Sequence, residues 1–69
     1  MTRYFFIVQG PDEKVDDVEG ALLPSDNAAI AHALRFISEI KKTAGRIDNS
    51  QWEVVVEGAD REPVVTIPF

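Results

Sequence analysis

Residues 25–44, SDNAAIAHALRFISEIKKTA, have the pattern of one long amphipathic helix. Their apolar side chains recur every three or four residues, which places them on one stripe of a helix with about 3.6 residues per turn. The stripe contains Ile30, Ala33, Leu34, Ile37, Ile40 and Ala44, widened by Ala29 and Phe36, and the polar side carries His32, Arg35, Glu39 and Lys42. The sequence therefore predicts a helix of about 30 Å that packs one face on a sheet.

The two ends of this segment carry residues that favour helix boundaries. Ser25 can accept a hydrogen bond from a free amide of the first turn, and Asp26 puts a negative charge at the positive end of the helix dipole. Lys41 and Lys42 lie near the negative end, and Gly45 allows a left-handed exit. We therefore expect the helix to run from Ser25 to Ala44.

The segments around the helix predict four strands. They are Arg3–Val8, Gly20–Leu23, Gln51–Glu57 and Val64–Phe69. The first strand would place Tyr4, Phe6 and Val8 on one face and Phe5 and Ile7 on the other. Pro63 and Pro68 place the last strand at an edge, because proline cannot donate to a sheet. The predicted fold is α+β, a two-layer ββαββ domain with an antiparallel sheet of order 2-1-3-4.

Bulk composition limits the class of protein. The 69 residues suit a single domain (1–69), and 45% apolar with 28% charged residues is typical of a folded globule. The net charge of -5 argues against nucleic-acid binding, because it repels phosphate backbones. The chain lacks cysteine, and its apolar runs are too short for a membrane span. We expect a soluble, cytoplasmic protein.

Three features of the sequence are candidates for catalysis or binding: a histidine, an acidic loop and a basic patch. His32, the only histidine, has no nucleophile at a one-turn spacing on the helix, so we interpret it as solvated. We interpret the acidic loop over residues 12–19 as a mobile, solvated loop, because it lacks the spacing of a calcium loop, and a weak cation site is the alternative. A basic patch forms toward the helix end, with Arg35, Lys41, Lys42 and Arg46. We predict no catalytic residue, metal or cofactor, and therefore a non-enzymatic protein.

The sheet face that the helix leaves bare is the strongest candidate for a site. Four apolar residues would gather there: Phe5, Ile7, Val55 and Val64. An apolar patch rimmed by polar groups commonly marks an association surface. We therefore predict a homodimer or a protein partner on this face. The alternative is a two-layer monomer whose acidic loop folds over the face.

Several segments resemble a family of short bacterial proteins, catalogued as domain of unknown function 6894. They are Arg3-Tyr4-Phe5-Phe6, Glu19-Gly20 with Leu23-Pro24, Ala28-Ala29, the Trp52 strand and Ile67-Pro68-Phe69. The resemblance implies an α+β fold and no assigned activity. Members often carry a histidine where this chain has Ile7, so a role for that histidine does not transfer.

Three hypotheses for function follow. The first is a small interaction domain that self-associates or docks a protein partner through the helix-free face. The second is an antitoxin-like or RNA-associated regulatory module, which would use Arg35 and Lys42. The third is an enzyme or ligand pocket built on His32 and the nearby carboxylates.

Overall fold

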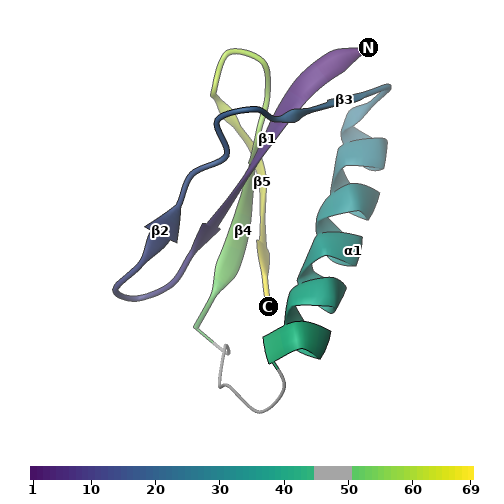
Figure 1. The fold of residues 1–69 in the computed structure, drawn as a ribbon. Coiled ribbons are helices and arrows are strands. Elements are labelled where there is room, and N and C mark those ends of the chain that lie inside the picture. The colour runs from purple at the N-terminus through teal and green to yellow at the C-terminus, as the bar shows by residue number, and fades with distance from the viewer. Residues whose placement is uncertain (45–50) are drawn as a thin grey trace.

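The computed structural model describes residues 1–44 and 51–69 and has two layers, a sheet and one helix that covers one of its faces (Figure 1). In chain order the elements are β1 (Thr2–Gln9), β2 (Lys14–Val15), β3 (Ala21–Leu23), α1 (Asp26–Ala44), β4 (Glu53–Glu57) and β5 (Pro63–Pro68). This arrangement confirms the α+β class. The predictions for Gly45 and Arg46 lie outside the described residues.

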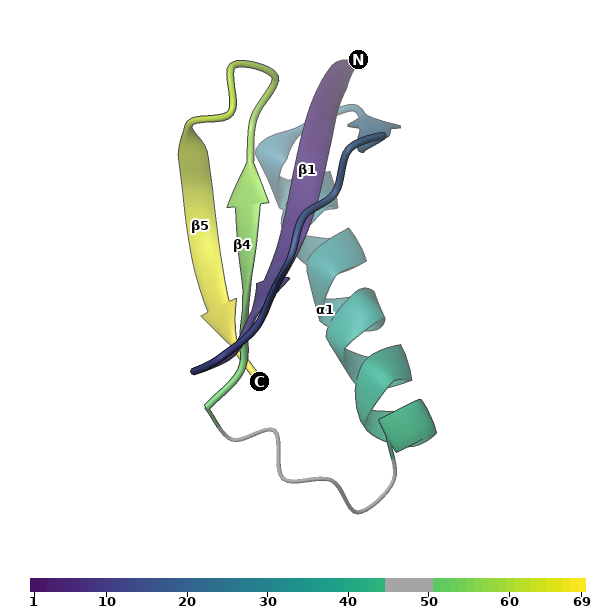
Figure 2. The same ribbon diagram turned by 60° about the vertical axis from the view of Figure 1, so that its left-hand side comes forward.

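The sheet is antiparallel throughout and follows the order β2-β1-β4-β5, with β3 paired to the start of β1. β3 lies on the side of β1 away from β4, as Figures 1 and 2 both show. The sheet therefore has one strand more than predicted. Lys14 and Val15, which we assigned to the acidic loop, pair with Gln9 and Val8. The edge beside β1 is divided between two short strands, and residues 16–20 connect them.

The core lies between α1 and the sheet face that β1 and β4 turn toward it. The sheet contributes Tyr4, Phe6, Val8, Val54 and Val56, and the helix contributes Ala29, Ala33 and Ile37. The predicted inward faces of the first and third predicted strands are thus confirmed. The predicted helix stripe was wrong at Leu34, whose side chain is 53% exposed. The two fully buried residues of the helix are alanines and Ile37 is buried with them, whereas Leu34 and Phe36 remain exposed.

Side chains secure both ends of α1. The Ser25 hydroxyl accepts a hydrogen bond from the Ala28 amide at 3.2 Å, as its predicted capping role requires. Asp26 accepts one from the Tyr4 hydroxyl at 2.5 Å, which ties the first turn to β1. Near the other end, Lys41 Nζ donates to the Phe69 carbonyl oxygen at 2.5 Å. The helix is therefore fixed to the sheet at both ends by polar contacts as well as by the core.

Strand β5 forms the edge of the sheet opposite β2 and β3. The Phe69 amide donates to the carbonyl of Trp52, the residue directly before β4, at 2.9 Å. The backbone groups of Phe69 therefore point toward the neighbouring strand. Backbone groups alternate in direction along a strand, so Pro68 and Thr66 turn theirs outward. Proline has no N–H to offer a further strand. The edge position predicted for the proline-flanked strand is confirmed.

Candidate functional site

The helix-free face of the sheet is largely covered within the monomer. Phe5 is only 9% exposed and Ile7 only 2% exposed, so the prediction that both lie open on this face was wrong. Val55 is half-buried, and Val64 remains 39% exposed. The predicted four-residue patch therefore does not exist as one exposed surface. The alternative reading, a loop folded over the face, agrees with this burial.

Arg61, in the turn between β4 and β5, supplies part of this cover. Its guanidinium carbon lies 4.0 Å from the centre of the Phe5 ring, within the range of a cation–π contact. The same guanidinium pairs with Asp16 at 2.6 Å and with Glu57 at 3.1 Å, and it donates to the Asp17 carbonyl at 3.0 Å. In Figure 2 the segment between β2 and β3 runs in front of β1, while α1 lies behind it. Arg61 thus holds the acidic segment against the helix-free face.

Asp17 completes the edge of β1 between the two short strands. Its carboxylate accepts hydrogen bonds from the Phe6 amide at 3.1 Å and from the Gly20 amide at 3.0 Å. A strand neighbour would normally satisfy the Phe6 amide, and an unpaired amide there would be costly. The acidic segment was predicted to be a mobile, solvated loop, and this was wrong for Asp16 and Asp17. Their carboxylates make specific contacts that hold the segment in place.

Gly20 lets the chain turn from this segment into β3. Its φ is 72°, in the left-handed region that favours glycine. A Cβ atom at this position would lie 2.7 Å from the Tyr4 carbonyl oxygen and 3.1 Å from Phe5 Cδ1. Both the backbone angle and the space therefore require glycine beside β1.

His32 lies against the sheet, which corrects its predicted position on the solvated side of the helix. The imidazole is half-buried, and its ring centre is 4.7 Å from that of Phe6. Among residues 1–44 and 51–69, no hydrogen bond joins His32 to a carboxylate or hydroxyl group. The side chain packs as an aromatic ring between α1 and β1.

The Tyr4–Asp26 pair joins the first strand to the first turn of α1 and shifts the titration of the tyrosine. The hydrogen bond to Asp26 raises the pKa of Tyr4 above its ordinary value of 10.0, and burial and the negative charge of Asp26 act in the same direction. A raised pKa keeps the phenol protonated and donating. Tyr4 therefore remains a neutral hydrogen-bond donor to the Asp26 carboxylate. We interpret the pair as a structural contact.

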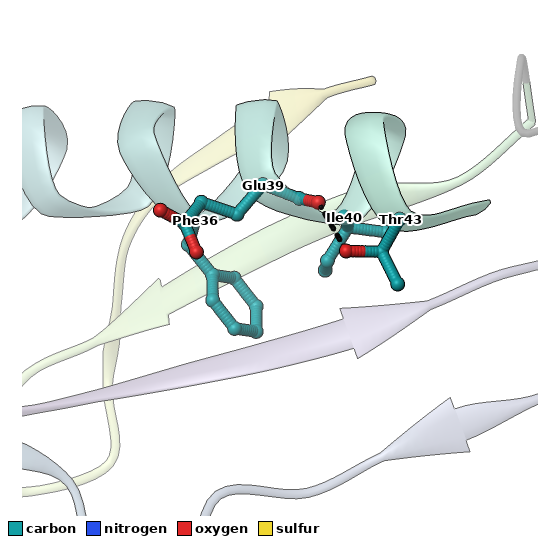
Figure 3. Close-up of a pocket in the computed structure, with 4 residues that line it drawn as sticks. All are labelled: Phe36, Glu39, Ile40 and Thr43. Carbon is teal, nitrogen blue, oxygen red and sulfur yellow. Dashed lines mark hydrogen bonds between the residues drawn. The ribbon is translucent and has the colours of Figure 1, made fainter. Parts of the chain in front are cut away.

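An apolar groove runs between α1 and the β1–β2 side of the sheet, and we call it the α1–β1 groove. Phe6 and Val8 line it from β1, and Val15 lines it from β2. On the helix side three adjoining hollows all include Phe36, with His32, Glu39, Ile40 and Thr43 around it. Phe36 projects from α1 toward β1 (Figure 3). The groove thus exposes part of the core to solvent along one flank of the helix.

Two exposed side chains line this groove, one from the helix and one from the sheet. Phe36 is 37% exposed and Val15 is 57% exposed. The sequence does not predict the groove, because helical periodicity assigns Phe36 to the buried stripe and the acidic composition assigns Val15 to a loop. The available signal was Val15 beside Lys14, an apolar residue next to a charged one, which is compatible with a very short strand.

The predicted acidic and basic clusters are weaker candidates for a binding site. Among the residues that the structure describes, no group of three or more His, Asp or Glu side chains could hold a metal ion. In the basic patch, Arg35 and Lys42 are exposed, whereas Lys41 is engaged with Phe69. Arg46 falls outside the described ranges. Within those ranges, no helix is both long enough and apolar enough to span a membrane.

The fold and these contacts define a small α+β domain in which the long N-terminal strand β1 pairs with β2, β3 and β4. A comparison with protein families matches residues 3–69 to the model described as Domain of unknown function (DUF6894). The chain belongs to this family. No curated protein and no solved structure matches it.

Proposed function

We propose that this protein is a small, non-enzymatic interaction domain that docks a segment of a protein partner in the α1–β1 groove. The observation that carries the proposal is the exposed pair Phe36 and Val15 above the core residues Phe6 and Val8. Exposed aromatic and aliphatic side chains above a concave apolar floor are typical of partner-binding surfaces. A segment laid in the groove would bury both exposed side chains.

The groove supports this proposal better than the helix-free face does. On that face Phe5 and Ile7 are already buried, and Arg61 ties the acidic segment over Phe5. Val64 is the one member of the predicted patch that remains exposed, at 39%. A single exposed valine needs no special explanation. We therefore keep the proposed docking function and assign it to the α1–β1 groove in place of the helix-free face.

A protein partner is favoured over a second copy of the chain. Two identical chains would each carry a net charge of -5, and like charges oppose association. Dimerisation is the competing outcome of the experiment below.

We place the protein in the cytoplasm, because a chain without cysteine does not depend on an oxidising compartment.

Selection from an unbiased phage-displayed peptide library tests the proposal. Peptides enriched on the wild-type protein should lose binding when Phe36→Lys or Val15→Lys is introduced, because either charge enters the groove. Leu34→Lys is the matched control, since Leu34 is also an exposed apolar residue of α1 but is absent from the residues lining the groove. Val64→Lys tests the helix-free face in the same way. Circular dichroism would confirm that each variant is folded.

The outcomes separate the alternatives. Loss of binding in Phe36→Lys and Val15→Lys, with binding retained in Leu34→Lys and Val64→Lys, supports the groove. Loss in Val64→Lys alone returns the site to the helix-free face. A dimer in light scattering that Phe36→Lys dissociates would replace the partner with a second copy. Absence of peptides that depend on Phe36 overturns the proposal.

A further inference from the structure

We infer that the segment bound in the α1–β1 groove is short, carries an apolar anchor residue and is flanked by basic residues. This inference rests on the proposed function and specifies the chemistry of the partner. It is drawn from the charges that line the groove, from its length and from the shape of its helix wall.

Three acidic residues and one basic residue line the groove. Asp16 and Asp17 lie on the sheet side, and Glu39 and Arg35 lie on the helix side. Asp17 accepts two backbone hydrogen bonds, which hold its charge in place. Asp16 is shared with Arg61, so Asp17 and Glu39 are the carboxylates with no described cationic partner. A bound segment with Lys or Arg beside its anchor would complement them.

The apolar anchor is expected over the hollow formed by Phe36, Glu39, Ile40 and Thr43. Figure 3 shows the Phe36 ring and the Ile40 side chain on the same side of α1 as β1. The polar groups of this hollow are already engaged in part, because the Thr43 hydroxyl donates to the Glu39 carbonyl at 3.0 Å. An aliphatic or aromatic side chain would therefore pack on Phe36 and Ile40, and a basic residue beside it would meet the Glu39 carboxylate.

The length of the groove sets the length of the segment. The helix wall extends from His32 to Thr43, which corresponds to roughly 16 Å at about 1.5 Å per residue. An extended chain covers this distance with about five residues. A groove of this length thus fits a linear motif.

The library selection described above distinguishes the inference from the proposed function. If the inference holds, enriched peptides that require Phe36 combine one or two large apolar residues with an excess of Lys and Arg. If enriched peptides require Phe36 but are acidic or uncharged, the inference fails and the docking function stands. If no peptide requires Phe36, both fail.

The best enriched peptide then serves as the probe in fluorescence anisotropy. Glu39→Gln should raise its Kd by about two- to fivefold, the range expected for one exposed ion pair. Glu62→Gln is the matched control, because Glu62 lies in the β4–β5 turn and does not line the groove. Raising the salt concentration should weaken binding to wild type more than to Glu39→Gln. Equal affinities and equal salt dependence in wild type and Glu39→Gln would overturn the charge complementarity.

Discussion

The guanidinium of Arg61 lies 4.0 Å above the ring of Phe5, and it joins the turn between β4 and β5 to the acidic segment that precedes β3. This contact turns a face that the sequence suggests is open into one that the monomer covers. It also makes part of the cover, the part over Phe5, depend on one side chain, whose removal can be tested directly.

Replacing Arg61 should loosen the acidic segment and expose Phe5. Arg61→Met removes the cation–π contact and two partly exposed ion pairs, so we expect a loss of about 1–2 kcal/mol in the free energy of unfolding. Arg61→Lys keeps the charge but not the planar fork, and it should fall between wild type and Arg61→Met. Urea denaturation gives the stabilities, and binding of an apolar fluorescent dye reports the exposure. Unchanged stability and dye binding in Arg61→Met would show that other groups cover Phe5.

The requirement for glycine at position 20 can be tested with one added methyl group. Gly20→Ala should cost at least about 2 kcal/mol of stability, because φ is 72° and the new Cβ would lie 2.7 Å from the Tyr4 carbonyl. Gly58→Ala is the control, since its nearest contact would be an ordinary 3.5 Å. We expect the control to remain within about 1 kcal/mol of wild type. Equal losses in the two variants would contradict the steric argument.

The Asp17 carboxylate should protect the Phe6 amide from solvent exchange. Asp17→Ala leaves the amides of Phe6 and Gly20 without their acceptor, and the expected loss is about 1–3 kcal/mol. Asp17→Asn retains one acceptor oxygen and should lose less. Hydrogen exchange followed by NMR should show faster exchange at Phe6 in Asp17→Ala. Asp12→Ala, at an exposed acid of the same segment, should leave that rate unchanged.

The Tyr4–Asp26 hydrogen bond predicts a loss of stability at alkaline pH. The pKa of Tyr4 is raised above 10.0 in the folded protein, chiefly by this hydrogen bond, so the unfolded chain loses the phenolic proton first. The contribution is therefore complete below pH 10.0 and is lost as the pH rises through the folded-state pKa. Tyr4→Phe should remove this part of the pH dependence of unfolding. Tyr4 is the only tyrosine, so phenolate absorbance gives its pKa directly. A pKa at or below 10.0 would contradict the prediction.

The positions of α1 and the main strands could be predicted because each has a distinct pattern of apolar residues. β1 is a continuous apolar run that is buried on both faces, β4 alternates around its buried residues, and Pro63 and Pro68 mark the edge strand. The rotation of α1 was harder to predict. Hydrophobic periodicity gives weight to large side chains such as Leu34 and Phe36, whereas the most buried residues of α1 are Ala29 and Ala33. The buried face of the helix therefore includes small residues and leaves two of its large apolar side chains exposed.

The cover on the helix-free face depends on contacts between residues far apart in the chain. Arg61 and Asp16 are 45 residues apart, and no periodicity in either segment points to the other. Asp17 likewise replaces a strand neighbour by accepting two amides, which a pattern of apolar residues cannot reveal. The α1–β1 groove was missed for the same reason, since its walls are defined by the rotation of α1 and by the two-residue strand β2.

The backbone nitrogen of Pro68, which carries no hydrogen, points away from the sheet, as do the backbone groups of Thr66. A second molecule that approached β5 to extend the ladder would find its hydrogen bonding interrupted there. Concentrated solutions of the folded protein should therefore resist growth into cross-β fibrils from this edge, and Pro68→Val should increase the rate at which a thioflavin signal develops.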